Sequence, residues 1–323
     1  MDEKEVLTII NPISGTRSKK GLEELVERTL GSAGMRVHFK YTRGPEDARR
    51  FASQAADSGF FAVVTAGGDG TVNEAARALV GRETALGIIP CGSGNGLARS
   101  IGVPSDFPEA LRIIAAGNTI TADCGTVNGL PFFCTFGVGF DAAVSEKFAS
   151  MKKRGKVNYI RSALLEFLNY RPQPYSISID GAVITEEAFL IAVCNASQYG
   201  NNAYIAPKAS LTDGLLDLTV IHSGSPFSTA LVGVDLLTGY IDRNTLIDTF
   251  RISSATLTRL RKGPAHFDGE PVELGRVLEV ECRPAALRLL TPSEMPEFKP
   301  VISPIRAFFS DLHYDLLNLL RRH

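Results

Sequence analysis

The chain has 323 residues, of which 44% are hydrophobic, and this is enough apolar sequence for the cores of two domains. Its 34 lysines and arginines nearly balance its 35 aspartates and glutamates, so there is no general positive field and nucleic acid is not expected as a partner. The five cysteines lack CxxC spacing, which argues against a disulfide framework and a zinc site. No apolar run reaches the roughly 18 residues of a membrane span and no signal-peptide pattern opens the chain, so we expect a cytoplasmic protein.

The first third of the chain alternates buried strands with amphipathic helices. Apolar runs predict strands at 6–10, 37–41, 60–64 and 86–90, and each is followed by apolar residues at helical spacing. This alternation is typical of a parallel sheet with right-handed crossovers, whose ligands bind at the carboxyl ends of the strands. We therefore predict an α/β nucleotide-binding domain over residues 1–122.

Three turns fall at these carboxyl ends. The first begins with Asn11 and Pro12, the second is the run Gly67 to Thr71, and the third extends from Cys91 to Gly96. Glycines leave backbone N–H groups open to a polyphosphate, and the helix after each glycine-rich turn adds the positive end of its dipole. Two such turns at neighbouring strands predict a shared phosphate site, although each alone is also an ordinary tight turn.

An acidic side chain lies inside the second turn. Asp69 would repel a phosphate unless it holds a metal ion or accepts a proton. The turn therefore favours nucleotide chemistry over simple anion binding. The alternative is a strand-to-helix connection that glycine and aspartate merely shape.

From about residue 119 the pattern changes to short strand-like runs separated by Gly, Pro, Asn and Asp. These runs lie at 120–126, 132–136, 175–179, 189–194, 216–221, 255–259 and 277–282. Their spacing predicts a mainly antiparallel β-sandwich over residues 123–295, whose edge strands offer pairing surfaces for a homodimer. A helical tail at 296–323 is expected to pack back on the first domain, and the alternative is a helix on a membrane surface.

A basic run precedes an apolar helical stretch inside the second domain. Lys152, Lys153, Arg154 and Lys156 could rest on anionic lipid. The alternative is a solvated helix start beside an ordinary core helix.

With the three turns, several later motifs resemble the diacylglycerol kinase catalytic family, which includes sphingosine kinases, ceramide kinases and bacterial lipid kinases. The matching segments are GGDGTVNE at 67–74, PCGSGNGLARSIGVP at 90–104, GVGFDA at 137–142, DGLLDL at 213–218 and FDGEP at 267–271. The resemblance implies an α/β domain with the parallel sheet of NAD kinases and diacylglycerol kinases. It also implies that the β-sandwich carries much of the acceptor site.

The resemblance further implies ATP as phosphate donor and Mg²⁺ as its ion. The residues that it places against ATP are Asn11, Thr42, Gly67, Gly68, Asp69, Gly70, Thr71, Val72, Asn73, Ser93 and Asn95. Family members often hold a second, structural Mg²⁺ near the DGLLDL segment, which here maps to Ser210, Asp213 and Leu215, two of them through backbone oxygen. Without the resemblance, the Asp-Gly pair at 213–214 is most simply a hairpin turn.

Phosphoryl transfer needs a group that takes the proton of the acceptor hydroxyl. The candidate carboxylates are Asp69, Asp123, Asp141, Asp268 and Glu270. The resemblance assigns this role to Glu270 in bacterial members and to Asp69 in the sphingosine kinases, and it places at Asp123 an acid linked to the same network. Asp141 matches a position that meets the polar head of the lipid, although GxGxD is also a common turn. His266 beside Phe267 is interpreted as structural.

The sequence thus predicts an ATP- and Mg²⁺-dependent kinase that phosphorylates a lipid hydroxyl at a membrane surface. Diacylglycerol and a sphingoid base both remain open as the acceptor, because Asn95 is followed by Gly96, a form found in relatives directed toward sphingosine. One alternative is a dinucleotide kinase similar to NAD kinases, which share GGDGT. Another is a catalytically silent module that binds nucleotide or lipid.

Overall fold

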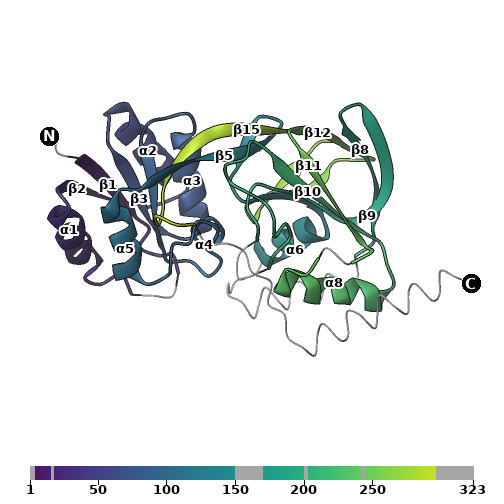
Figure 1. Ribbon diagram of the computed structural model, residues 1–323, viewed down its shortest axis with the longest axis horizontal. Helices are drawn as coiled ribbons and strands as arrows, with labels where there is room; N and C mark the ends of the chain where they lie inside the picture. The colour runs from purple at the N-terminus through teal and green to yellow at the C-terminus, as the bar shows by residue number, and fades with distance from the viewer. Residues whose placement is uncertain (1–3, 16–17, 150–169, 200–202, 242–243, 296–323) are drawn as a thin grey trace, which may run out of the picture.

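The computed structural model describes residues 4–15, 18–149, 170–199, 203–241 and 244–295. These residues form an α/β part and a β-sandwich joined by two long strands (Figure 1). The predicted fold class is confirmed. The basic run at 152–156 and the predicted tail helix at 296–323 lie outside the described residues.

Four parallel strands form the sheet of the α/β part, and helices cover both of its faces. In spatial order the strands are β2 (Met35–Tyr41), β1 (Lys4–Ile10), β3 (Ala62–Gly67) and β4 (Ala85–Pro90). The helices are α1 (Leu22–Ser32), α2 (Asp47–Asp57), α3 (Asp69–Leu79), the short α4 (Gly96–Ser100) and α5 (Phe107–Ala116). Every residue of β3 and β4 is buried, which explains their continuous apolar runs.

Small side chains hold α3 firmly in place. Ala48, Ala52 and Ala55 form the buried face of α2, and they share one hydrophobic core with Ala75 and Ala76 of α3. Alanine at this helical spacing lets the two helices approach closely. The second turn therefore leads into a helix whose position is fixed by close packing.

The sandwich is antiparallel, as its turn spacing predicts. Its strands are β6 (Leu130–Phe132), β7 (Thr135–Gly139), β8 (Gln173–Ile179), β9 (Ala182–Cys194), β10 (Leu216–His222), β11 (Ile247–Ile252), β12 (Ser254–Arg259), β13 (Gly263–Phe267) and β14 (Glu270–Leu274). Two helices accompany them, α6 (Phe140–Ala149) and α8 (Pro226–Thr238). A core that includes Phe132, Phe136 and Phe267 fills the interior. No helix within the described part of the chain is long and apolar enough to cross a bilayer.

One predicted strand is wrong. The run at 132–136 is two strands, β6 and β7, separated by Phe133 and Cys134. The N–H groups of these two residues donate to the carboxylate of Asp268 rather than to a neighbouring strand. The Asp268 side chain therefore ends β6 at Phe132, although the apolar pattern of the sequence continues beyond it.

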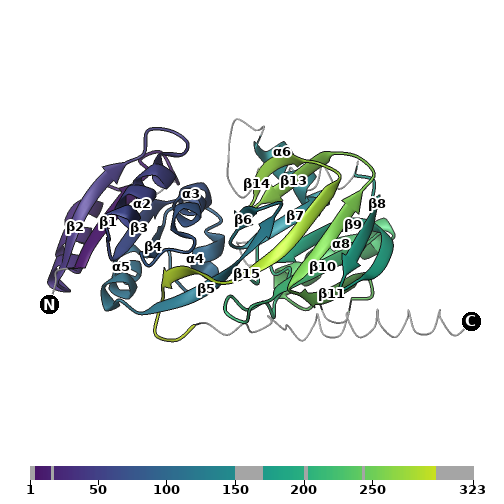
Figure 2. The ribbon, with the colours of Figure 1, turned by 90° about the horizontal axis from the view of Figure 1, so that it is seen from above.

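Two long strands connect the parts. β5 (Thr119–Val127) pairs antiparallel with β15 (Val277–Leu290), and the two run side by side from one part to the other (Figures 1 and 2). β15 pairs with β12 of the sandwich and, at Leu289, with β4 of the parallel sheet. The predicted boundary between residues 122 and 123 falls inside β5, a strand that serves both parts.

The β13–β14 hairpin is fastened to the sandwich at its open end. Arg259 of β12 is 4% exposed, and its guanidinium donates to the carbonyl oxygens of Gly263, Pro264, Leu274 and Gly275 at 2.7 to 3.0 Å. These carbonyls lie at the start of β13 and at the end of β14. The closed end of the same hairpin, residues 267–270, reaches the α/β part.

Candidate active site

The first turn is fastened to both neighbouring strands and to α3. The N–H of Asn11 donates to the carbonyl of Ala66 at 3.0 Å, and its side-chain amide donates to Thr71 Oγ1 at 3.0 Å. Thr42, which follows β2 and is 8% exposed, donates its N–H to Ile10 at 3.0 Å. Asn11 and Thr42 therefore lie together at the carboxyl edge of the sheet.

The second and third turns touch each other. A Cβ atom on Gly92 would lie 2.9 Å from the Cα of Gly68, which is too close for two carbon atoms, so the contact requires glycine. Asp69 bonds the turns together, because its carboxylate accepts from the N–H groups of Asn95 at 2.9 Å and of Gly96 at 2.7 Å. Both oxygens of Asp69 are thus directed at the backbone of the third turn.

The other residues predicted to meet ATP lie along the same edge. Gly67 ends β3, Gly68 precedes α3, and Asp69, Gly70, Thr71, Val72 and Asn73 form the start of α3. Ser93 is exposed in the third turn, whereas Asn95 is buried there in a left-handed conformation with φ +53°. Because the first N–H groups of a helix have no partner within that helix, this end of α3 suits a phosphate.

A two-residue turn of the sandwich faces the start of α3. Asp268 and Gly269, with φ +52° and +85°, connect β13 to β14 as in a type I′ hairpin. The Asp268 carboxylate accepts from four N–H donors. These are the backbone of Phe133 at 3.0 Å, Cys134 at 2.7 Å and Thr135 at 2.9 Å, and the side-chain amide of Asn73 at 2.6 Å.

The bond from Asn73 crosses from the α/β part to the sandwich. Asn73 is 4% exposed on α3, and its amide meets an acid 195 positions along the chain. Burial raises the pKa of the Asp268 carboxyl above its usual value, and the four N–H donors act against that rise. Asp268 therefore joins the hairpin turn to the start of α3.

Glu270 begins β14 directly after this turn. Its Oε1 atom lies 2.7 Å from the position that a Cβ atom on Gly70 would occupy. A side chain at residue 70 would make this carboxylate shift. An acid of the sandwich thus lies at the start of α3, the helix that follows the second turn.

Asp123 lies on the linking strands. It faces the register shift of β15 between Arg283 and Leu287, and its carboxylate accepts from the N–H groups of Ala285 and Gly214, both at 2.7 Å. The Asp123 carbonyl accepts from the side chain of Asn195 at 2.9 Å. These contacts hold the loop before β10 against the linking strands.

Asp141, the predicted head-group contact, is 8% exposed at the start of α6. Its Oδ1 accepts from the N–H of Ala142 at 2.8 Å, while its Oδ2 accepts from the Tyr199 hydroxyl at 2.8 Å and lies 3.0 Å from His266 Nε2. Local spacing gives no sign of the pair with His266, because 125 positions separate the two residues. Both oxygens of Asp141 are occupied by protein donors.

The residues predicted to hold a structural Mg²⁺ meet other partners. Ser210 Oγ accepts from the N–H of Thr212 at 3.4 Å, and Asp213 accepts from the N–H of Leu215 at 3.1 Å and forms an ion pair with Arg251. Within the described ranges, no group of three His, Cys, Asp or Glu side chains is suited to a metal ion. The guanidinium already meets the charge of Asp213, so an ion held by this carboxylate and by backbone oxygens would have to displace Arg251.

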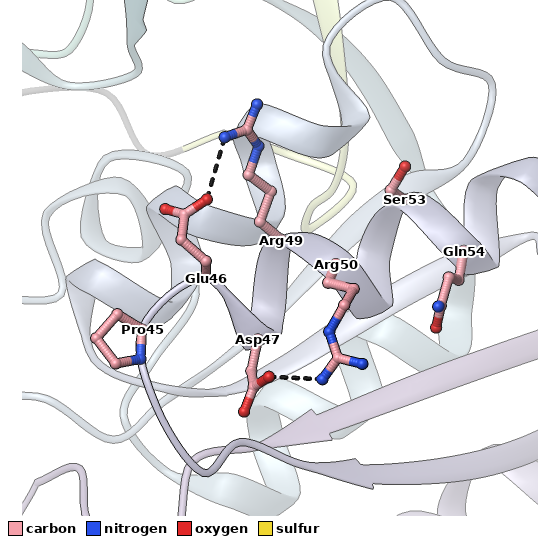
Figure 3. Close-up of a pocket in the computed structure, with 7 residues that line it drawn as sticks. All are labelled: Pro45, Glu46, Asp47, Arg49, Arg50, Ser53 and Gln54. Carbon is pink, nitrogen blue, oxygen red and sulfur yellow. Dashed lines mark hydrogen bonds and ion pairs between the residues drawn. The ribbon is translucent and has the colours of Figure 1, made fainter.

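A hollow beside α2 is separate from this site. It is lined by Pro45, Glu46, Asp47, Arg49, Arg50, Ser53 and Gln54 (Figure 3). Arg49 pairs with Glu46 at 3.1 Å and Arg50 pairs with Asp47 at 2.6 Å. None of the residues predicted to bind ATP or lipid lines the hollow, so we assign it no role in the site.

Two family models match the chain. Residues 5–127 match the diacylglycerol kinase catalytic domain, and residues 134–291 match the YegS C-terminal NAD kinase beta sandwich-like domain. The "Probable lipid kinase YegS" of Shigella boydii is 32% identical over 274 residues, which cover 83% of this chain and 90% of that protein. The protein of the same name from Escherichia coli is 31% identical over the same length and shares of each chain.

Crystal structures show the same fold. A diacylglycerol kinase from Bacillus anthracis superposes with a TM-score of 0.72 at 21% identity, covering 92% of this chain and 100% of that one. A second structure from the same organism reaches a TM-score of 0.76 at 24% identity, covering 91% and 99%.

Fold, site and relatives together define a kinase with an α/β nucleotide part and a β-sandwich. More particularly, the chain belongs to the YegS-like lipid kinases, whose first domain is the diacylglycerol kinase catalytic domain. The predictions of a lipid kinase and of ATP use at family level are confirmed, and the dinucleotide and silent-module alternatives lose their support.

Replacing Asp268 with asparagine is expected to lower the free energy of unfolding by about 2–3 kcal/mol, because one amide cannot accept from four N–H donors. Urea unfolding followed by circular dichroism measures this change. Asp180 provides a matched control, since it is exposed and begins the Asp-Gly turn between β8 and β9 with φ +49°. Asp180→Asn should change stability by no more than about 0.5 kcal/mol. Equal losses in the two variants would contradict a special role for Asp268.

Removing divalent cations with EDTA is expected to leave the melting temperature of the nucleotide-free protein unchanged, because Arg251 supplies the positive charge at Asp213. Arg251→Met should cost about 0.5–1 kcal/mol, as for an exposed ion pair, and should make the melting temperature rise with added Mg²⁺. Differential scanning fluorimetry with and without Mg²⁺ tests both points. A drop of the wild-type melting temperature in EDTA would show that an ion holds this loop.

Proposed function

We propose that this lipid kinase transfers the γ-phosphoryl group of Mg²⁺-bound ATP to a lipid hydroxyl at a membrane surface, with Glu270 as the proton acceptor. The observation that supports the proposal is the approach of the Glu270 carboxylate to Gly70, at 2.7 Å from the position of a Cβ atom. An acid from one domain there meets the phosphate-binding turns of the other. The predicted basic run at 152–156 would hold such an enzyme at an anionic bilayer.

The glycine-rich turns and the start of α3 bind the phosphates in this proposal. Their backbone N–H groups and the positive end of the α3 dipole favour negative charge. When bound, Mg²⁺ neutralises charge that develops on the transferred group. Thr71, whose hydroxyl accepts from Asn11, and Asn73, whose amide binds Asp268, keep the first turn of α3 in a fixed orientation.

Glu270 is a better proton acceptor than Asp69 on geometric grounds. The two oxygens of Asp69 each accept a backbone N–H of the third turn, which directs that carboxylate away from an incoming hydroxyl. Glu270 is exposed and lies on β14, an edge strand of the sandwich, where a lipid can approach. In this arrangement Asp69 organises the phosphate site and Glu270 takes the proton.

The contacts of Asp141 favour an acceptor with an uncharged head. A lipid amine would have to displace His266 or Tyr199 from the Asp141 carboxylate. An uncharged alcohol such as diacylglycerol needs no such displacement. We therefore propose that diacylglycerol-like alcohols are preferred over sphingoid bases.

Glu270→Gln is expected to lower kcat by a factor on the order of 10² to 10⁴, because the amide cannot accept the hydroxyl proton. The KM for ATP should stay close to the wild-type value, since the phosphate-binding turns are intact. Transfer of labelled phosphate from ATP to lipid measures both quantities. Glu273→Gln is the matched control, because Glu273 is an exposed acid on the same strand and pairs with Lys262 at 3.1 Å. Near-normal turnover in Glu270→Gln would remove Glu270 from the mechanism.

With equal amounts of acceptor in mixed micelles, kcat/KM is expected to be higher for diacylglycerol than for sphingosine, because Asp141 is occupied by protein donors. NAD in the same assay should receive no phosphate. Mass spectrometry of the products identifies the acceptor. A higher kcat/KM for sphingosine would show that the amine reaches Asp141.

A further inference from the structure

A buried histidine joins the turn before Glu270 to Asp141. His266 is 2% exposed on β13, directly opposite Gly137 of β7. The N–H of Gly269 donates to His266 Nδ1 at 3.3 Å, and His266 Nε2 lies 3.0 Å from Asp141 Oδ2. The histidine thus connects the hairpin turn to a carboxylate in the interior of the sandwich.

These two contacts select one form of the imidazole. A backbone N–H can only donate, so Nδ1 must carry a lone pair, and a carboxylate accepts, so Nε2 must carry the proton. Gly137 makes the arrangement possible, because a Cβ atom there would lie 2.1 Å from Asp141 Oδ2 and 2.4 Å from His266 Nε2. Further donors to Asp141 are the Tyr199 hydroxyl and the N–H of Ala142.

We infer that His266 is a positioning residue, held by Asp141, that fixes the peptide before Gly269 and thereby the direction of the Glu270 carboxylate. This inference rests on the proposed role of Glu270 as proton acceptor. His266 acts through the turn, since its two ring nitrogens are directed at Gly269 and Asp141.

The turn places Glu270 directly after the contact with His266. Its two central residues, Asp268 and Gly269, both have φ > 0, as a type I′ turn requires. The Asp268 carboxylate holds the first of these residues, whereas the bond from Gly269 to His266 holds the peptide that follows it. Glu270 follows Gly269 directly, so a restraint on Gly269 limits where the Glu270 side chain begins.

Two substitutions separate the halves of the contact. In His266→Asn the amide oxygen can accept from Gly269 in place of Nδ1, but the shorter side chain cannot donate to Asp141. In His266→Gln the amide nitrogen can donate to Asp141 in place of Nε2, but the acceptor for Gly269 is lost. We expect H266N to keep kcat within about threefold and H266Q to lower kcat on the order of tenfold to a hundredfold, with KM for ATP and lipid unchanged.

The control is His222→Gln, because His222 lies on β10 of the same sandwich and pairs with Asp248 at 2.8 Å. This variant should keep wild-type kcat. Equal losses of kcat in H266N and H266Q, or a change confined to KM, would overturn the inference. In a Glu270→Gln background H266Q should cause no further loss, and an additional tenfold loss there would also overturn it. Wild-type turnover in Glu270→Gln alone would instead refute the proposed function, which distinguishes the two failures.

A spectrum of the wild-type protein tests the same point without a variant. Nuclear magnetic resonance of ¹⁵N-histidine distinguishes the two neutral tautomers and the charged ring. We expect a histidine in the Nε2–H form with a hydrogen-bonded Nδ1 at the pH of the assay. Finding all five histidines charged or in the Nδ1–H form would overturn the inference.

Discussion

The carboxylate of Asp268 is the group on which the geometry of the candidate site depends. It accepts from three successive backbone N–H groups, two between β6 and β7 and one at the first residue of β7, and from the amide of Asn73 in the other part of the molecule. Hydrogen bonds to an ionised acceptor are stronger than neutral ones, and burial increases the cost of breaking them. Because Asn73 is near the start of α3, this one side chain sets the hairpin turn against that end of the helix.

The rest of the fold supports that contact from a distance. β5 and β15 run through both parts as a continuous antiparallel pair, so the sandwich is joined to the parallel sheet by backbone hydrogen bonds. Asp123 reinforces this pair where the register of β15 shifts. Arg259 holds the open end of the β13–β14 hairpin, and a hairpin held at its base delivers its turn to a defined place. Together these restraints fix an acid of one part over a glycine of the other.

The sequence predicts features that arise from near neighbours, and it misses those that arise from distant ones. The buried strands of the α/β part, the type of their glycine-rich turns and Asp69 as a candidate acid follow from local patterns, whereas Glu270 comes from the family resemblance. The break between β6 and β7 does not, because the acid that causes it is about 135 positions away. For the same reason the sequence does not predict the pair of Asp141 with His266 or the hydrogen bonds that Asp123 accepts from Gly214 and Ala285. The residue types of a site can be predicted from nearby sequence, whereas their hydrogen-bond partners depend on which distant segments the fold brings together.

The five candidate acids differ in their surroundings. Asp69, Asp123, Asp141 and Asp268 each accept two or more protein donors, so their charge is met inside the fold and their orientation is fixed. Among the five, Glu270 is the one at an exposed position, and it is also the one that approaches the start of α3. A carboxylate that must receive a proton has to meet the acceptor directly, and a carboxylate that shapes a turn does not. Exposure and the approach to Gly70 therefore distinguish Glu270 from the other four acids, as its proposed role of proton acceptor requires.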